Sequence, residues 1–133
     1  LSHWPELGQL AHVTPKPVKE AAFNDIVLQG DAIDLTRLPI QTCWPEDAGP
    51  LVTLGLVTTR GTRKMRQNVA IYRQQVIGPR RLIMRWLPHR GGALDFADWC
   101  ADRPGEPFPL LVSIGVDPAT LLAAVAPIPD TVG

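Results

Sequence analysis

The sequence has few cysteines and no long apolar run. Its only cysteines, Cys43 and Cys100, are too few for a disulfide framework and lack the paired spacing of a zinc site, so we expect both to be buried thiols. No apolar run reaches the roughly 18 residues of a membrane span, and the N-terminus lacks the charged-then-apolar pattern of a secretory signal. We therefore expect a cytoplasmic protein.

Glycine-rich phosphate-binding motifs are absent as well. Neither G-x-G-x-x-G nor G-x-x-x-x-G-K-[ST] occurs, which excludes the common dinucleotide-binding and P-loop classes. The sequence also has no internal repeat and no low-complexity tract. Its 45% hydrophobic and 20% charged residues are ordinary for a globular protein, and 133 residues allow one domain with a modest core.

Acidic residues are missing from the middle of the chain. No Asp or Glu occurs between Asp47 and Asp95, whereas nine of the 13 Lys and Arg residues lie there. Because the formal net charge of the whole chain is zero, the charges are separated along the sequence, and the middle should carry a positive local field. This pattern predicts an anion-binding region. The nine residues are Arg60, Arg63, Lys64, Arg66, Arg73, Arg80, Arg81, Arg85 and Arg90.

The basic middle has the pattern of a β-hairpin. Two apolar runs, 69–72 and 82–87, flank the Gly-Pro pair at 78–79. Arg73 and Arg85 are then expected inside strands, where a guanidinium is costly to bury without a partner. Since the local sequence holds no carboxylate, that partner is either a distant acid or a ligand anion such as phosphate or carboxylate.

Three helices are expected from apolar periodicity. We place them at 1–11, 93–101 and 119–125. In the second helix the apolar residues suit one face, and the opposite face carries Asp95, Asp98 and Asp102. The third should begin with Asp117 as its N-cap and Pro118 in its first turn.

Short strands are expected over much of the rest. The candidates are 26–28, 51–60 as one bent strand or two short ones, and 108–115, which is apolar enough to be buried. Linkers, turns or loops are expected at 14–18, 44–50 and 61–64, and an irregular connection or edge strand at 34–40. Strands dominate the middle and helices punctuate it, which favours a small α+β domain around an antiparallel barrel or sheet.

Asn68 and His89 are candidate metal ligands. Asn68 begins the first strand of the predicted hairpin and His89 follows the second, so pairing would bring them together. An amide oxygen and an imidazole, joined by a carboxylate and phosphate oxygens, would suit Mn²⁺ or Mg²⁺. The alternative is an Asn that bonds backbone groups at a strand end and a surface His.

Two runs of this region, RQNVAIYRQQVIG and LIMRWLPHRGG, resemble the signature of the UbiD family of decarboxylases, the 3-octaprenyl-4-hydroxybenzoate carboxy-lyases of ubiquinone biosynthesis. The resemblance extends through DLTRLPIQTCWPEDAGP and PFPLLVSIGVDPATLLAAVAPIPDT, so it covers 34–131 and leaves 1–33 as an N-terminal lead-in. It implies that residues 1–133 are the central cofactor-binding domain of a longer chain. The fold it implies is a flavin-reductase-like, antiparallel split β-barrel with a few short helices.

The resemblance also assigns site residues. It implies that prenylated FMN contacts Ile71, Tyr72, Arg73, Arg85, Trp86, Leu87, Arg90 and Gly91, and that Asn68 and His89 bind a divalent metal such as Mn²⁺. Arginines would meet the phosphate, apolar residues the ring, and Gly91 would allow a close backbone approach. For Trp86 taken alone, core packing is the favoured interpretation. Strict strand alternation would put Asn68 and Arg73 on opposite faces, so either the strand bends there or the cofactor wraps its end.

The implied activity is decarboxylation of 3-polyprenyl-4-hydroxybenzoate to 2-polyprenylphenol, with Arg73 holding the substrate carboxylate. A further metal ligand, a Glu, and the proton donor are expected beyond Gly133, so residues 1–133 alone should be inactive. The resemblance further implies a prenylated aromatic acid as substrate, a flavin prenyltransferase as cofactor supplier and a homo-oligomer. Location would be cytoplasmic, with peripheral attachment to the inner membrane as an option.

Two other functions compete with this hypothesis. One is a flavin- or phosphate-binding module without chemistry of its own. The other is a nucleic-acid surface, for which affinity should fall steeply with salt. Only Tyr72 and Trp86 are aromatic among the arginines, so stacking platforms for bases are scarce. We therefore expect no nucleic-acid partner.

Overall fold

The computed structural model describes residues 18–126. The chain divides into two units, residues 1–32 and 33–133. The described part of the first unit contains two 3-10 helices, η1 (Ala22–Asn24) and η2 (Gly30–Ala32). The strand expected at 26–28 is wrong, because those residues are irregular and exposed and no strand of the described part of this unit is available to pair with them. The helix expected at 1–11 and most of the linker at 14–18 lie outside the described residues.

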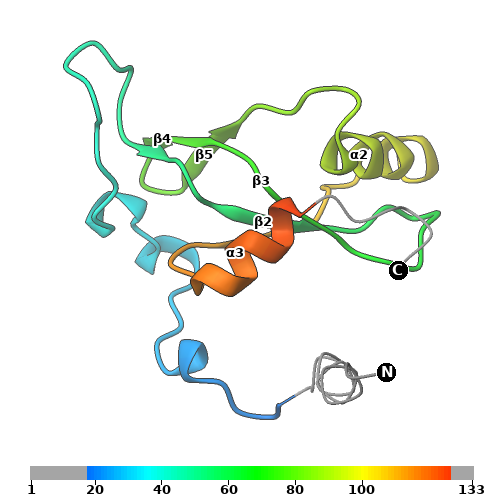
Figure 1. Ribbon diagram of the computed structural model, residues 1–133, viewed down its shortest axis with the longest axis horizontal. Coiled ribbons are helices and arrows are strands. Elements are labelled where there is room, and N and C mark those ends of the chain that lie inside the picture. The colour runs from blue at the N-terminus through cyan, green and yellow to red at the C-terminus, as the bar shows by residue number, and fades with distance from the viewer. Residues whose placement is uncertain (1–17, 127–133) are drawn as a thin grey trace, which may run out of the picture. The chain divides into compact units, whose positions relative to one another are not determined.

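The described part of the second unit, residues 33–126, contains two three-stranded antiparallel sheets (Figure 1). One has the order β1 (Leu51–Val52), β4 (Gln74–Gly78) and β5 (Arg81–Met84); the other has the order β3 (Asn68–Ile71), β2 (Leu56–Thr59) and β6 (Leu111–Ser113). Helices η3 (Leu35–Arg37), α2 (Gly91–Asp102) and α3 (Pro118–Val125) complete the unit. The α+β class with antiparallel strands and a few helices is confirmed. The strands at 33–126 do not close into a barrel.

The hairpin around 78–79 has a different first strand from the one predicted. The strand that pairs with β5 across this turn is β4, and β3 pairs with β2 in the other sheet. The chain leaves β3 after Ile71, so Arg73 lies between two strands and Arg85 follows the end of β5. Both arginines were predicted inside strands, and both lie just outside them. The residue after β3 is Tyr72, whose side chain is buried and whose hydroxyl accepts a hydrogen bond from the Gly92 N–H of α2.

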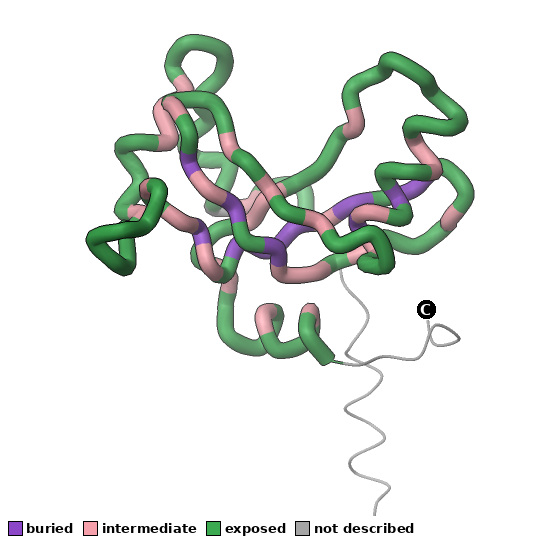
Figure 2. The backbone as a smooth tube through the Cα atoms, turned by 90° about the horizontal axis from the view of Figure 1, so that it is seen from above, coloured by how far each residue is buried: buried purple, intermediate pink, exposed green. Residues whose placement is uncertain are grey.

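Segment 51–60 forms two short strands that belong to different sheets, which was one of the two alternatives predicted. Figure 2 shows buried positions along the middle of the chain with exposed segments around them. The buried apolar residues of the described chain gather on and beside these strands and β4. They are Val52, Leu56, Val57, Tyr72 and Val76. The apolar core of the described chain is therefore small.

Gly55, between β1 and β2, has no room for a side chain. A Cβ there would lie 2.7 Å from Nε2 of Gln74 and 3.0 Å from Cγ1 of Val52. Gln74 is fully buried, and its Nε2 donates to the Tyr72 carbonyl at 2.9 Å, so it cannot move aside freely. We expect Gly55→Ala to lower the free energy of unfolding by about 1–3 kcal/mol, measured by urea denaturation. Gly78→Ala is the control, since its nearest atom is 3.8 Å away; equal losses would contradict this account.

Aspartates cap two of the helices. Asp117 is the N-cap of α3 and accepts a hydrogen bond from the Thr120 backbone N–H at 3.0 Å, with Pro118 in the first turn, as predicted. Asp34 likewise caps η3 and accepts from the Thr36 backbone N–H at 3.0 Å. Segment 34–40 is therefore an irregular connection and not an edge strand. Within residues 18–126, no helix has the length and apolar character needed to cross a membrane.

Three burial predictions are wrong. Helix α2 buries Asp95, which is 1% exposed, whereas Leu94 and Phe96 on the predicted apolar face are 46% and 44% exposed. Cys43 and Cys100 are both exposed, because the first lies in a loop and the second on the outer side of α2. Within 108–115 only β6 is a strand, and it forms the edge of its sheet, which leaves its residues exposed or half-buried.

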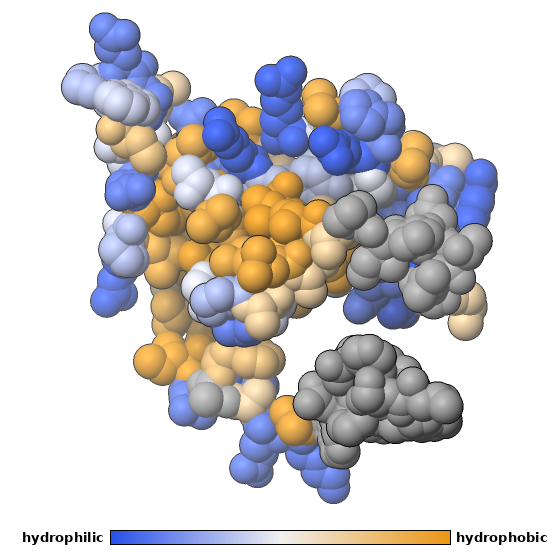
Figure 3. All heavy atoms as spheres, in the orientation of Figure 1, coloured by the Kyte–Doolittle hydropathy of each residue, from blue (hydrophilic) through white to orange (hydrophobic). Residues whose placement is uncertain are grey.

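Helix α3 packs against β3 and still presents an apolar outer surface. Leu122 and Val125 of this helix are exposed. The face of the molecule that carries α3 shows apolar side chains gathered at its centre (Figure 3). Exposed apolar surface of this kind is typical of a region where a ligand or further polypeptide binds.

Candidate functional site

Two cavities lie along β3 and the start of α2. The arginine cavity has a volume of about 760 Å³ and includes Arg73, Arg85 and Arg90 in its lining. The histidine cavity has a volume of about 880 Å³ and includes His89. Asn68 and Gly91 line both of them, so the two cavities adjoin. Residues from three separate segments, 68–73, 85–91 and α3, therefore meet at one place.

Most of the predicted cofactor residues lie together. Seven of the eight line the arginine cavity, namely Ile71, Tyr72, Arg73, Arg85, Leu87, Arg90 and Gly91. The predicted metal ligands, Asn68 and His89, share the histidine cavity. Asn68 and Arg73 line one cavity even though alternation predicts opposite faces, because β3 ends at Ile71 and the alternation ends with it.

Trp86 is the predicted cofactor residue that is absent from the cavity lining. Its ring centroid lies 6.0 Å from that of Tyr72, 5.6 Å from that of Phe96 and 6.1 Å from that of Phe108. Its Nε1 donates to the sulfur of Met84. Trp86 thus belongs to an aromatic cluster that packs the end of β5 against α2 and the segment before β6, as in the core-packing alternative.

The three arginines of the arginine cavity carry unbalanced charge. Arg73, Arg85 and Arg90 are exposed, and within residues 18–126 no carboxylate forms an ion pair or hydrogen bond with their guanidinium groups. They come from separate segments, so the fold and not the local sequence brings them together. A cluster of this kind favours a bound anion.

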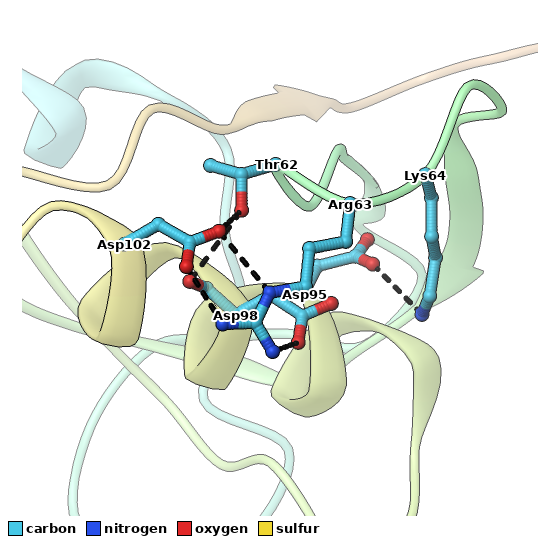
Figure 4. Close-up of polar contacts among 6 residues, drawn as sticks. All are labelled: Thr62, Arg63, Lys64, Asp95, Asp98 and Asp102. Atoms are coloured by element: carbon cyan, nitrogen blue, oxygen red, sulfur yellow. Dashed lines mark hydrogen bonds and ion pairs between the residues drawn. The ribbon is translucent and has the colours of Figure 1, made fainter.

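The basic turn at 61–64 is neutralised by α2, in contrast to those arginines. Arg63 Nη2 lies 2.6 Å from Oδ1 of Asp102, and Lys64 Nζ lies 3.2 Å from Oδ1 of Asp95. Figure 4 shows the acids of one helix facing the cations of the neighbouring loop. Sequence reasoning missed this pairing, although the spacing of residues 95, 98 and 102 places three carboxylates on one side of a helix.

The Asp102 pair predicts a pH dependence of stability. The hydrogen bond from Arg63, followed by that from Thr62, lowers the pKa of Asp102 below its ordinary value of 3.8. The pair therefore stabilises the fold at pH values above the pKa that Asp102 has in the unfolded state. This contribution is lost as the pH falls through the lower pKa of Asp102 in the folded state. We expect Asp102→Asn to lower the urea midpoint at neutral pH. Between about pH 5 and about pH 2 the urea midpoint of this variant should fall less than that of the wild type. An equal fall in both proteins would refute the assignment.

A chain of hydrogen bonds, buried at Thr59 and Asp95, connects this helix to Asn68. Asn68 Nδ2 donates to Thr59 Oγ1 at 3.1 Å, and Thr59 Oγ1 donates to Asp95 Oδ2 at 2.7 Å. Thr59 lies directly opposite Asn68 in the β2–β3 pairing and, like Asp95, is buried. The Asn68 amide is thus bonded through its nitrogen. Its oxygen lies beside Gly91, where a Cβ would come within 2.1 Å of Oδ1.

The start of α2 also faces the arginine cavity. Arg90 is the N-cap and makes no side-chain cap hydrogen bond, whereas the Gly92 N–H donates to the Tyr72 hydroxyl at 3.0 Å. Backbone N–H groups and the helix dipole at such an end favour a negative charge, above all a phosphate. The 12-residue helix therefore adds to the field of the three arginines.

Comparison with known proteins identifies the family. Residues 15–133 match the family described as the 3-octaprenyl-4-hydroxybenzoate carboxy-lyase Rift-related domain, UbiD. The chain belongs to the UbiD family. The resemblance predicted from residues 34–131 is therefore confirmed, and the match begins nearly 20 residues earlier than predicted.

Solved structures agree with the UbiD assignment. HmfF from Pelotomaculum thermopropionicum, a UbiD-class enzyme solved with FMN, is 40% identical, with a TM-score of 0.66 over 74% of this chain and 22% of HmfF. An evolved dimeric form of HmfF, solved with prFMN, is also 40% identical, with a TM-score of 0.65 over 74% of this chain and 22% of that protein. Apo 3,4-dihydroxybenzoic acid decarboxylase (AroY) from Klebsiella pneumoniae is 32% identical, with a TM-score of 0.66 over 74% of this chain and 20% of AroY. The UbiD chain described here therefore matches about a fifth of each of these proteins.

Proposed function

We propose that this UbiD chain forms the flavin-binding part of a decarboxylase and that the arginine cavity holds prenylated FMN. The observation that carries the proposal is the convergence of Arg73, Arg85 and Arg90, unpaired within residues 18–126, on one cavity of about 760 Å³. HmfF, with 40% identity over 74% of this chain, was solved with FMN and, in an evolved form, with prFMN.

The lining of the arginine cavity suits a phosphorylated ring system. Arg85, Arg90 and the N-terminus of α2 supply donors and positive charge for the phosphate. Ile71 and Leu87 offer apolar surface for a ring, and Gly91 leaves space for a close approach. When bound, the modified flavin supplies an electron sink for the electrons of the broken C–CO₂ bond.

Arg73 binds the substrate carboxylate in this proposal. Its guanidinium is exposed at the cavity between β3 and β4, where a carboxylate could accept two parallel hydrogen bonds. Held there, the carboxylate leaves as CO₂ and the ring carbon takes a proton. The acid that delivers this proton lies outside residues 18–126, as does the remaining carboxylate ligand of the metal.

We assign the substrate as a prenylated 4-hydroxybenzoate in ubiquinone biosynthesis, in line with the name of the matching family. AroY, named for 3,4-dihydroxybenzoic acid, shows that related chains act on other aromatic acids. A flavin prenyltransferase would supply the cofactor. The apolar surface of α3 would be covered by the rest of the protein or by the prenyl group of the substrate.

The divalent metal, proposed to be Mn²⁺, would bind to Asn68 and His89. Both line the histidine cavity. The Asn68 side chain donates to Thr59 through its nitrogen, and its amide oxygen is a hard ligand suited to Mn²⁺. Among residues 18–126 no three His, Cys, Asp or Glu side chains gather as a ligand set. Further ligands would therefore come from the cofactor phosphate and the rest of the protein. An ion bound there would supply positive charge for the phosphate.

Three larger-scale features belong to the same proposal. The two antiparallel sheets would form part of a flavin-reductase-like split barrel completed elsewhere in the protein. A homo-oligomer is expected, and the evolved HmfF is described as dimeric. A cytoplasmic location, with peripheral attachment to the inner membrane as an option, stays a prediction.

The test uses the whole native protein purified from cells that make prenylated flavin. We expect flavin absorbance together with CO₂ release from a 3-polyprenyl-4-hydroxybenzoate, and no CO₂ from protein made without the flavin prenyltransferase. Bound flavin without CO₂ release from any aromatic acid would favour the non-catalytic flavin-binding module. Protein that retains no flavin would contradict both.

A further inference from the structure

Asn68 can point either end of its amide toward the cavities, and only one end can bind a metal. The carboxamide oxygen is a ligand, whereas the NH₂ group only donates hydrogen bonds. If Asn68 is a ligand, as the proposed function requires, something in the fold has to select its orientation. A chain of hydrogen bonds runs from Asn68 through Thr59 and Asp95 to Lys64.

We propose that Asp95, acting through Thr59, is the positioning residue that turns the Asn68 amide oxygen toward the metal site. This inference rests on the proposed function. It assigns a task to a buried acid that the proposed chemistry does not use. Asp95 is 1% exposed, and its carboxylate is bonded to Thr59 and Lys64.

The direction of the hydrogen bonds follows from counting protons. Thr59 has one hydroxyl proton, and an ionised Asp95 can only accept, so the 2.7 Å contact uses that proton. The hydroxyl oxygen then has only lone pairs left for its other neighbour. At 3.1 Å, the group of Asn68 that suits those lone pairs is the NH₂. The carbonyl end is left beside Gly91, which lines both cavities.

Lys64 and the backbone keep this chain in place. Lys64 Nζ donates to the second oxygen of Asp95 at 3.2 Å, which balances the buried charge. Thr59 and Asn68 are register partners on adjacent strands. A Cβ at Gly61 would lie 3.0 Å from Oδ1 of Asp95, so the turn packs closely on the carboxylate. The position of Asp95 is thus fixed on several sides.

Replacing Asp95 should therefore reverse the direction of these hydrogen bonds and not merely weaken them. The amide of Asp95→Asn can donate to Thr59, whose proton is then free to reach the Asn68 oxygen and turn the NH₂ toward the metal site. Thr59→Val removes the relay altogether, whereas Thr59→Ser keeps a hydroxyl that can perform it. Loss of a partner that orients a metal ligand typically costs about 10- to 100-fold in metal affinity.

The test measures Mn²⁺ affinity in the whole native protein, purified with its flavin and stripped of metal, from the EPR signal of free Mn²⁺. We expect Asp95→Asn and Thr59→Val to weaken binding by about 10- to 100-fold, and Thr59→Ser to stay near the wild type. Asp102→Asn removes an acid from the same helix at the protein surface and should leave the affinity unchanged. Wild-type affinity in Thr59→Val, or an equal loss in Thr59→Ser, overturns the proposal.

A second comparison separates orientation from general structural support. The two oxygens of Asn68→Asp are equivalent, so its orientation no longer matters. We expect the Asp95→Asn penalty to vanish or reverse in that background, since the freed Thr59 proton can then bond the new carboxylate. An undiminished penalty overturns the positioning role. A wild-type protein that holds flavin but no Mn²⁺ overturns the metal site itself and with it this inference, while the flavin proposal stands.

Discussion

Arg73→Ala will lower kcat/KM for decarboxylation by about 10²–10³-fold in the whole native protein, the loss expected when a preorganised donor to a reacting group is removed. Arg73 has no carboxylate partner within residues 18–126 and lines the arginine cavity between β3 and β4. Its fork can hold a substrate carboxylate by two hydrogen bonds. Arg73→Lys keeps the charge but not the fork, so we expect an intermediate loss. CO₂ release at varied substrate concentration measures the effect.

Arg81→Ala is the matched control for this experiment. Arg81 belongs to the same basic middle and is exposed on β5, but it is not part of the cavity lining. Flavin absorbance should be retained in both variants, because the phosphate is assigned to Arg85 and Arg90. Full activity in Arg73→Ala, or a loss in Arg81→Ala that matches it, would show that Arg73 does not bind the substrate.

The second large effect is expected from Gly91→Ala. A Cβ at this position would lie 2.1 Å from Oδ1 and 2.7 Å from Cγ of Asn68, far inside van der Waals contact. Either α2 or β3 has to shift, and both cavities share these two residues. We expect the purified variant to lose both bound flavin and Mn²⁺, measured by absorbance and metal analysis, even if it stays folded.

Gly78→Ala controls for the general effect of adding a methyl group to a glycine. Its Cβ would meet nothing closer than 3.8 Å, at Nε of Arg81, so its flavin and metal content should equal those of the wild type. Circular dichroism of Gly91→Ala distinguishes loss of the site from loss of the fold. Wild-type flavin and Mn²⁺ content in folded Gly91→Ala would contradict the placement of the site.

The grouping of most candidate residues at one place was predictable because they lie in two continuous runs. The segments 68–73 and 85–91 contain no acidic residue, are separated by the Gly-Pro pair at 78–79 and carry the family signature. Caps such as Asp117 were predictable for a similar reason, since a cap depends on neighbours within three residues.

Tertiary pairing is what the sequence could not supply. Alternation and turn signals predicted strands near β3 and β5 but missed β4, and they did not show that β3 pairs with β2 while β4 pairs with β5. The burial of Asp95 was missed because a carboxylate is buried only when partners elsewhere in the chain, in this case Thr59 and Lys64, compensate for its desolvation. Those partners lie more than 30 residues away.

A crystal structure of the whole native protein purified with prenylated flavin would test the central claim most directly. The account predicts the flavin in the arginine cavity, its phosphate within hydrogen-bond distance of Arg85 or Arg90, and Asn68 beside a divalent metal. The contrary result would be flavin bound elsewhere, with Arg73, Arg85 and Arg90 paired to carboxylates from outside residues 18–126.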